Sequence, residues 1–181
     1  MKKLFLFLIA LISFSAINAQ TNKTKWLFGI KAGFNHTVIN GFETNGNKTG
    51  FSGSTIYGSL FTEKSISETM FLGTELTFSW VNDWNFVEIP FHLRQILNKQ
   101  ISVFAGPKFD LAVDKLFDST KEQNSKFFGM SAEVGAQYSF SKHVFAEGKY
   151  SFGVTRSFYD SEFDINKGLR NNFRLGIGYC F

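Results

Sequence analysis

The side chains best suited to chemistry are few and widely separated along this chain. His36, His92 and His143 share no short ligand spacing, whereas a metal site needs several converging ligands. Cys180 is the single cysteine, which excludes a disulfide framework and a thiolate cluster. We therefore interpret the histidines as structural and Cys180 as a small side chain buried inside the fold. No metal and no cofactor is expected.

Catalytic motifs are equally weak. A hydrolase needs a nucleophile, a base and an orienting carboxylate on one face, and the apolar strand faces described below carry no carboxylate. The glycine pairs Gly29–Gly33 and Gly176–Gly178 lie within extended segments rather than at a strand-to-helix turn, so they do not predict phosphate binding. The sequence therefore predicts a protein that is not an enzyme.

The elements that position these residues alternate between apolar and polar types with a period of two, as β-strands do. In residues 70–81, Leu72, Leu76 and Trp80 share one face, while Glu75 and Thr77 share the other. No helical pattern competes. The strands are predicted at 26–37, 50–62, 70–81, 85–96, 101–113, 127–140, 144–155 and 168–181.

The two faces of these segments differ sharply in charge. The apolar face carries no Asp, Glu, Lys or Arg. In segment 50–62, Ile56 and Leu60 are assigned to the charged face, which predicts one apolar patch there. The charged face carries Lys31, Glu75, Glu88, Arg94, Lys108, Asp110, Glu133, Glu147, Lys149, Arg170 and Arg174.

Alternation alone fits a soluble barrel with its apolar face inside or a membrane barrel with a polar lumen. Three features favour the membrane barrel. Long gaps at 38–49, 114–126 and 156–167 alternate with short connections, each segment exceeds the roughly 9–11 residues that cross a bilayer, and aromatic residues such as Trp26 and Trp80 lie near segment ends. A soluble eight-stranded barrel that binds an apolar ligand remains an alternative.

An open sheet edge cannot exist in hydrocarbon, so the eight antiparallel strands are predicted to close into an up-and-down transmembrane β-barrel. Its interior is just wide enough for side chains, and the charges inside need partners. We expect a polar plug, with a narrow channel for small solutes as the alternative. Pro90 and Pro107 cannot donate to a ladder, so a bulge or a locally missing bond is expected at each.

The first nineteen residues have the parts of a secretory signal peptide. Lys2 and Lys3 precede an apolar run, and Ala19 precedes a polar stretch that begins at Gln20. Cleavage there leaves residues 20–181 as one barrel domain. Without Lys2 and Lys3 the chain has 17 basic and 15 acidic residues, too balanced to indicate a nucleic-acid partner.

Several segments resemble the porin-family outer-membrane β-barrel domain of Gram-negative bacteria. Residues 86–94 (FVEIPFHLR), 104–107 (FAGP) and 145–155 (FAEGKYSFGVT) are similar to strands of that family, and Phe181 matches its terminal aromatic residue. The resemblance covers roughly the whole mature chain. It implies an eight-stranded barrel in the cell outer membrane, contact with outer-membrane lipid, and no single activity.

The final strand also resembles the assembly signal of outer-membrane barrels, which implies the barrel-assembly machinery as a partner during biogenesis. Aromatic residues in the long gaps either pack along the rim or offer a surface to an unknown partner; they are Phe42, Phe117, Phe158, Tyr159 and Phe163. The assembly signal would consist of Phe173, Leu175, Ile177, Tyr179 and Phe181.

Overall fold

The structure, a computed structural model, describes residues 25–81, 84–113, 128–156, 158–160 and 165–181. The predicted signal peptide and the gap 114–126 lie outside the described residues. Among the described residues, no helix could cross a membrane. The strands are β1 (Trp26–Phe42), β2 (Lys48–Ser65), β3 (Met70–Val81), β4 (Trp84–Ile96), β5 (Ile101–Ala112), β6 (Phe128–Ser139), β7 (Val144–Gly153), β8 (Phe158–Asp160) and β9 (Ile165–Cys180).

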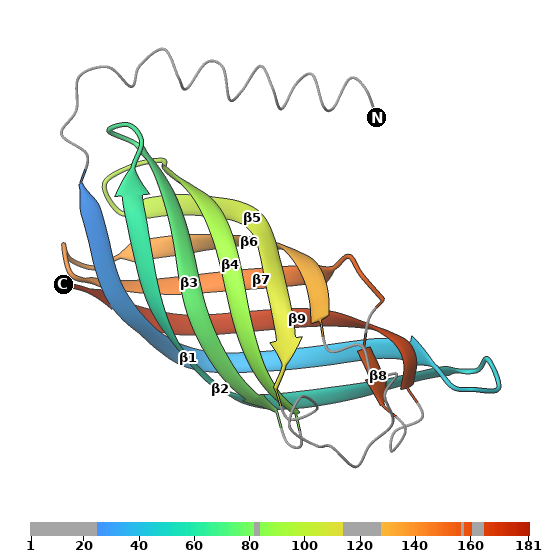
Figure 1. Ribbon diagram of the computed structural model, residues 1–181. Coiled ribbons are helices and arrows are strands. Elements are labelled where there is room, and N and C mark those ends of the chain that lie inside the picture. Colours follow the sequence, from blue (N-terminus) through green and yellow to red (C-terminus); the bar gives the residue numbers. More distant parts are fainter. Residues whose placement is uncertain (1–24, 82–83, 114–127, 157, 161–164) are drawn as a thin grey trace, which may run out of the picture.

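Eight of these strands form one closed antiparallel barrel (Figure 1). Strands β1 to β7 pair in sequence order, β7 pairs with β9, and β9 pairs with β1 to close the barrel. Short β8 pairs only with the start of β9. The predicted fold class, an all-β eight-stranded up-and-down barrel, is confirmed.

The strands are tilted, as closure requires. Following the register once around the barrel from Gly29 leads back to β1 near Ile39, ten residues further along the strand. Because of this stagger, inward side chains at different heights along β1 meet different sets of strands across the lumen.

One end of the barrel, here called the turn end, is formed by three four-residue turns with the same bonding. The N–H groups of Ile66, Leu97 and Phe140 each donate to a carbonyl four residues later, all at 2.9 Å. The second residue of each turn accepts backbone N–H bonds through its side-chain oxygen, as polar turn residues do; these residues are Ser67, Asn98 and Ser141.

The opposite end, here called the loop end, differs from the prediction. The gap 38–49 is mostly strand, because β1 continues to Phe42 and β2 begins at Lys48, and the connecting turn has Gly46 at φ 91°. The hairpin projects beyond the other strands (Figure 1). Similarly, β9 begins three residues earlier than predicted, through a bulge at which Lys167 adopts φ 55°.

The two prolines interrupt the ladders without shifting the register. Partners are missing between Thr74–Phe91 and Thr77–Glu88 on one side of β4, and around Pro107 on its other side. The expected local loss of pairing is therefore found, and no bulge occurs there.

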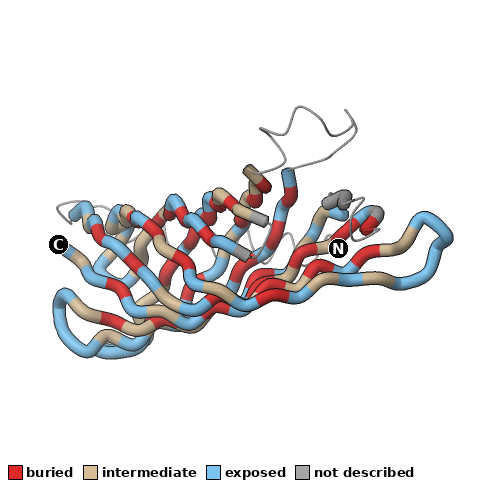
Figure 2. The backbone as a smooth tube through the Cα atoms, turned by 90° about the horizontal axis from the view of Figure 1, so that it is seen from below, coloured by how far each residue is buried: buried red, intermediate tan, exposed pale blue. Residues whose placement is uncertain are grey.

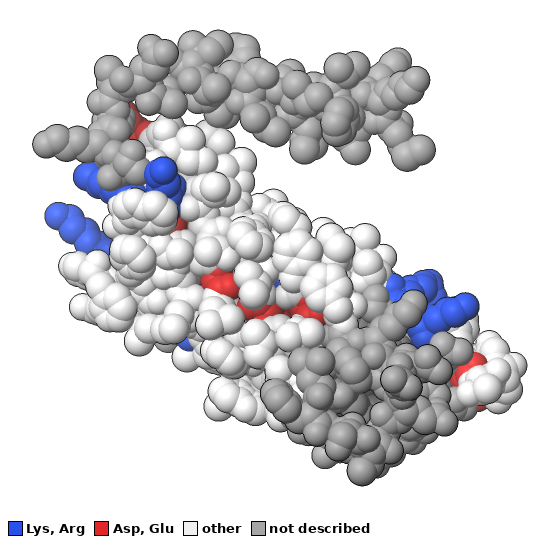
Figure 3. Space-filling view, in the orientation of Figure 1, with Lys and Arg blue, Asp and Glu red and all other residues white. Residues whose placement is uncertain are grey.

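Exposure alternates along the strands (Figure 2). The outward side chains are mostly apolar, with Phe28 54% and Leu175 51% exposed. Lys and Arg gather mainly at the two ends of the wall seen in Figure 3. The apolar-out arrangement predicted from the two faces is thus observed along most strands.

The face assignment was wrong in β2. Ile56 and Leu60 point outward, 68% and 58% exposed, whereas Tyr57 and Phe61 are buried at 2% and 7%. The predicted apolar patch of Ile56 and Leu60 on the inner wall does not exist. Aromatic rings take its place there.

Candidate functional site

The charged residues that the sequence places on one face all line the lumen. Their exposed fractions run from 0% to 8%, and each lies within 4 Å of an oppositely charged group. Ten of them form two clusters, and the eleventh, Arg94, lies near the turn end. They are Lys31, Glu75, Glu88, Arg94, Lys108, Asp110, Glu133, Glu147, Lys149, Arg170 and Arg174.

The cluster nearer the turn end is built on two ammonium groups, and we call it the lysine cluster. Lys31 forms ion pairs with Glu75 and, at 2.8 Å, with Glu147. Lys149 lies 2.9 Å from Glu75, 3.2 Å from Glu147 and 3.8 Å from Glu133. Each ammonium group is thus shared among carboxylates from different strands.

Histidine, serine and tyrosine side chains complete the lysine cluster. His92 Nε2 lies 2.8 Å from Glu133 Oε1, and the Ser151 hydroxyl donates to the other oxygen of Glu133 at 2.5 Å. Tyr57 donates to Glu147 at 3.1 Å. The three carboxylates therefore accept bonds from side chains around the barrel wall.

The cluster nearer the loop end centres on Glu88, and we call it the arginine cluster. Glu88 pairs with Arg174, with Lys108 at 2.7 Å and with Arg170 at 3.1 Å. Asp110 takes Lys108 at 3.1 Å and Arg170 at 2.7 Å. The Glu88 carboxylate thus contacts three cations, although its side chain is fully buried.

Polar side chains extend the arginine cluster, but not completely. Arg174 Nε donates to Asn35 at 2.8 Å, and Asn172 donates to Glu88 at 3.4 Å. Among the described residues, Arg170 Nε, Arg174 Nη1 and the Thr77 hydroxyl find no partner. A rigid guanidinium fork cannot turn every N–H toward an acceptor at once.

The two clusters differ in their ratio of basic to acidic residues. The lysine cluster sets two ammonium groups and His92 among three carboxylates, whereas the arginine cluster sets three cations against two carboxylates. Because uncompensated buried charge is costly, the three cations of the arginine cluster depend heavily on its two carboxylates.

An aromatic layer separates the lysine cluster from the turn end. Phe61, Phe104 and Phe145 surround the Lys31 ammonium group, which lies 4.9, 6.0 and 5.6 Å from their ring centroids. Such contacts stabilise a desolvated cation. We call these three residues the phenylalanine layer.

Each ring of the phenylalanine layer rests on a glycine directly opposite in the neighbouring strand. The pairs are Phe61 with Gly29, Phe104 with Gly135, and Phe145 with Gly178. A Cβ atom at any of these glycines would collide with the ring. The glycines therefore provide the space that lets three large side chains turn inward.

An apolar cluster fills the lumen toward the loop end. Ile39, Phe86, Ala112 and Ile165 are at most 1% exposed and pack together, and the guanidinium carbon of Arg170 lies 3.6 Å from the Phe86 ring centroid. Along the described strands the lumen thus contains, from the loop end toward the turn end, an apolar cluster, two charge clusters and the phenylalanine layer.

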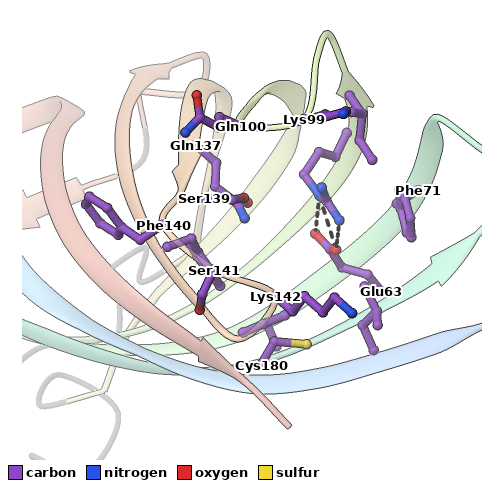
Figure 4. Close-up of a pocket in the computed structure, with 15 residues that line it drawn as sticks. Glu63, Phe71, Lys99, Gln100, Gln137, Ser139, Phe140, Ser141, Lys142 and Cys180 are labelled. Atoms are coloured by element: carbon purple, nitrogen blue, oxygen red, sulfur yellow. Dashed lines mark hydrogen bonds and ion pairs between the residues drawn. The ribbon is translucent and has the colours of Figure 1, made fainter.

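Beyond the phenylalanine layer a cavity of about 400 Å³ opens at the turn end (Figure 4). Arg94 lies in its wall, bonded through Nε to Glu63 at 2.9 and 3.1 Å and stacked 4.4 Å from the Phe71 ring. Cys180 lines the cavity and is only partly buried, so it faces inward as predicted but is less buried than expected.

Sequence reasoning missed Glu63, Tyr57 and the phenylalanine layer. Glu63 lies just past the predicted end of segment 50–62, and Tyr57 and Phe61 were assigned to the wrong face. Parity alone is ambiguous here, because Glu63 shares the parity of Phe61 and Tyr57 while Lys64 shares that of Leu60 and Ile56. The available signal was the glycine opposite each inward ring, Gly29 for Phe61 and Gly33 for Tyr57.

The histidines do not come together. His36 Nδ1 lies 2.8 Å from the Ser54 hydroxyl, an exposed contact, and His143 Nδ1 lies 2.9 Å from the Cys180 carbonyl. In the described parts of the chain, no group of three His, Cys, Asp or Glu side chains could hold a metal ion.

The residues of the proposed assembly signal form one outward row at the end of β9. Their exposed fractions are 40% for Phe173, 51% for Leu175, 63% for Ile177, 46% for Tyr179 and 72% for Phe181. Their placement leaves the row accessible from outside the barrel.

Comparisons with protein-family models and with curated proteins found no match. Among solved structures, the attachment invasion locus protein Ail of Yersinia pestis is similar, with a TM-score of 0.54 and 11% identity over 87% of this chain and 99% of that chain. Neisserial surface protein A is also similar, with a TM-score of 0.52 and 11% identity over 85% of this chain and 97% of that chain.

The fold is that of the eight-stranded outer-membrane β-barrels. At 11% identity the likeness to Ail and neisserial surface protein A concerns architecture alone. It confirms the barrel that the family resemblance of the sequence implies.

Proposed function

We propose that this protein is a non-enzymatic barrel of the Gram-negative outer membrane, with a structural or surface-interaction role and a lumen that passes no solute. The outward apolar side chains support contact with outer-membrane lipid, because a lipid-facing barrel wall must be apolar. Closure supports it too, because no strand edge can remain open in hydrocarbon.

The filled lumen is the observation that carries the non-conducting role. A solute would have to displace the phenylalanine layer, break both charge clusters and separate Phe86 from Ile39 and Ile165. Breaking even one buried pair costs about 3–5 kcal/mol. The narrow-channel alternative has no such continuous path to support it.

The projecting β1–β2 hairpin supports a role at the surface. Its outward side chains become polar beyond Phe34, with Asn40, Ser52 and Ser54 exposed, so this part of the sheet suits water rather than lipid. Ile39 is fully buried beneath it. The hairpin is thus an ordered, strand-paired extension of the sheet beyond the apolar wall.

Planar-bilayer recording of the refolded protein tests the proposal, with an open porin in the same lipid as positive control. We expect no conductance steps. Regular steps at single-protein dilution would instead establish the channel alternative. Gradient fractionation of cells tests the location, and recovery with soluble proteins would favour the soluble barrel.

We also propose that the outward row ending at Phe181 engages the barrel-assembly machinery. Phe181→Ser should lower the amount of folded barrel in the membrane fraction, measured by heat-modifiable electrophoretic mobility. Phe140→Ser is the matched control, since Phe140 is similarly exposed at 63% but lies in a turn. Equal losses in both variants would contradict a specific role for Phe181.

A further inference from the structure

The cavity at the turn end is closed from below and open on one side. Its floor includes Phe61 and Phe145, which pack edge to face with centroids 5.8 Å apart. Its volume of about 400 Å³ falls within the roughly 300–1,000 Å³ of small-molecule sites. A ligand could therefore enter from the turn end and rest on the rings without passing through the barrel.

The lining of the cavity has unequal charge. Arg94, Lys99 and Lys142 line it together with a single carboxylate, Glu63. Glu63 already accepts a bidentate pair of hydrogen bonds from Arg94. Lys99 and Lys142 are exposed and have no other carboxylate among the lining residues.

The two lysines occupy equivalent positions in two of the three matching turns. Lys142 extends toward Glu63, and Lys99 lies on the other side of the ion pair that Glu63 makes with Arg94 (Figure 4). Other parts of the wall present amide and hydroxyl groups, which can donate hydrogen bonds to an acid group; they belong to Gln100, Gln137, Ser139 and Ser141.

We propose that this cavity binds small soluble organic anions with an apolar body, such as aromatic carboxylates. The apolar body would contact the phenylalanine floor, and the acid group would lie between Lys99 and Lys142, where an anion gains from both charges. A cation of the same shape would meet two like charges and gain nothing from Glu63. The inference does not depend on where the barrel resides or whether it conducts.

Cys180 is a built-in reporter, because it lines the cavity and is the only cysteine in the chain. The refolded protein in neutral detergent is treated with thiosulfonate reagents of equal size and opposite charge. Relative to a small free thiol, the anionic reagent should be favoured by about tenfold at low salt, and the preference should fade as salt screens the lysines.

The charge-reversed variant Lys99→Glu/Lys142→Glu should invert this preference. Lys48→Glu/Lys64→Glu is the matched control, since it makes the same charge change at exposed lysines that do not line the cavity, and it should keep the preference. Heat-modifiable mobility verifies that both variants fold. An unchanged preference in the first variant would overturn the proposal.

Protection tests binding itself. We expect naphthalene-2-carboxylate to slow modification of Cys180 in a saturable way by at least about threefold, and naphthylmethylammonium to have little effect. The protection should disappear in Lys99→Glu/Lys142→Glu. No protection by the carboxylate, or equal protection by the ammonium compound, would show that the cavity is not an anion site.

Discussion

The two charge clusters of the lumen occupy the same barrel but are built differently. The lysine cluster shares two mobile ammonium groups among three carboxylates, and Lys149 alone reaches all three. The arginine cluster concentrates three cations on Glu88, with Asp110 as the only second carboxylate. The lysine cluster therefore has alternative partners for each ammonium group, whereas the arginine cluster depends on Glu88.

Side-chain chemistry explains this difference. An ammonium group donates in three rotatable directions, whereas a guanidinium group presents a fixed planar fork. The fork gives Arg174 bonds to Glu88 and Asn35 but leaves its Nη1 without a described partner. Arginine thus makes directional contacts but leaves some of its N–H groups without an acceptor.

The largest effect is expected from Glu88→Gln. It leaves three buried cations facing only Asp110, so the free energy of unfolding should fall by about 3–5 kcal/mol. Urea unfolding of the refolded barrel, followed by electrophoretic mobility, measures the change. A loss below about 1 kcal/mol would mean that Glu88 is not the centre of its cluster.

Glu75→Gln should cost less than half as much. Lys31 keeps Glu147, Lys149 keeps Glu147 and Glu133, and His92 keeps Glu133, so each basic group retains a carboxylate partner. The same unfolding assay makes the comparison direct. Equal losses for Glu75→Gln and Glu88→Gln would contradict the proposed difference between the clusters.

A second substitution should partly rescue the arginine cluster. Adding Lys108→Met to Glu88→Gln removes the cation that Glu88 held at 2.7 Å, so the double variant should be more stable than Glu88→Gln alone by about 1–2 kcal/mol. The single variant Lys108→Met completes the cycle. Strictly additive losses would show that these two residues are not coupled.

The smallest effect is expected at the turn end, where solvent weakens charge interactions. Arg94→Lys loses the bidentate hydrogen bonds to Glu63 and the stacking on Phe71. We expect the free energy of unfolding to fall by about 1 kcal/mol. Lys64→Arg, at an exposed position, is a control that should leave the unfolding midpoint unchanged.

The barrel was predictable because its outer and inner walls impose a period of two on most strands. The prediction failed in β2, where both faces contain apolar residues: Ile56 and Leu60 on one, Tyr57 and Phe61 on the other. Hydrophobicity cannot choose between them, and only the glycines opposite the rings in neighbouring strands do. The prediction also failed at the loop end, since a strand of mostly polar residues beyond the apolar wall has the composition of a loop.

The members of the charge network were visible in the sequence, but their partners were not. Lys31 and Glu147 are 116 residues apart, and Arg174 and Glu88 are 86 residues apart. Such pairs depend on the stagger of the closed barrel, which alternation does not encode. Glu63 was missed for a simpler reason, because the predicted strand ended at residue 62, whereas β2 continues to Ser65.

The contact between Phe61 and Phe145 has a consequence for the order of folding. Phe61 belongs to β2 and Phe145 to β7, and these strands are separated in the barrel by β1 and β9. Their rings can meet only after β1 has joined β9 in the native register. Until that moment both rings and the Lys31 ammonium group are left with incomplete packing. The aromatic contact therefore adds packing across the β1–β9 seam that exists only in the closed barrel.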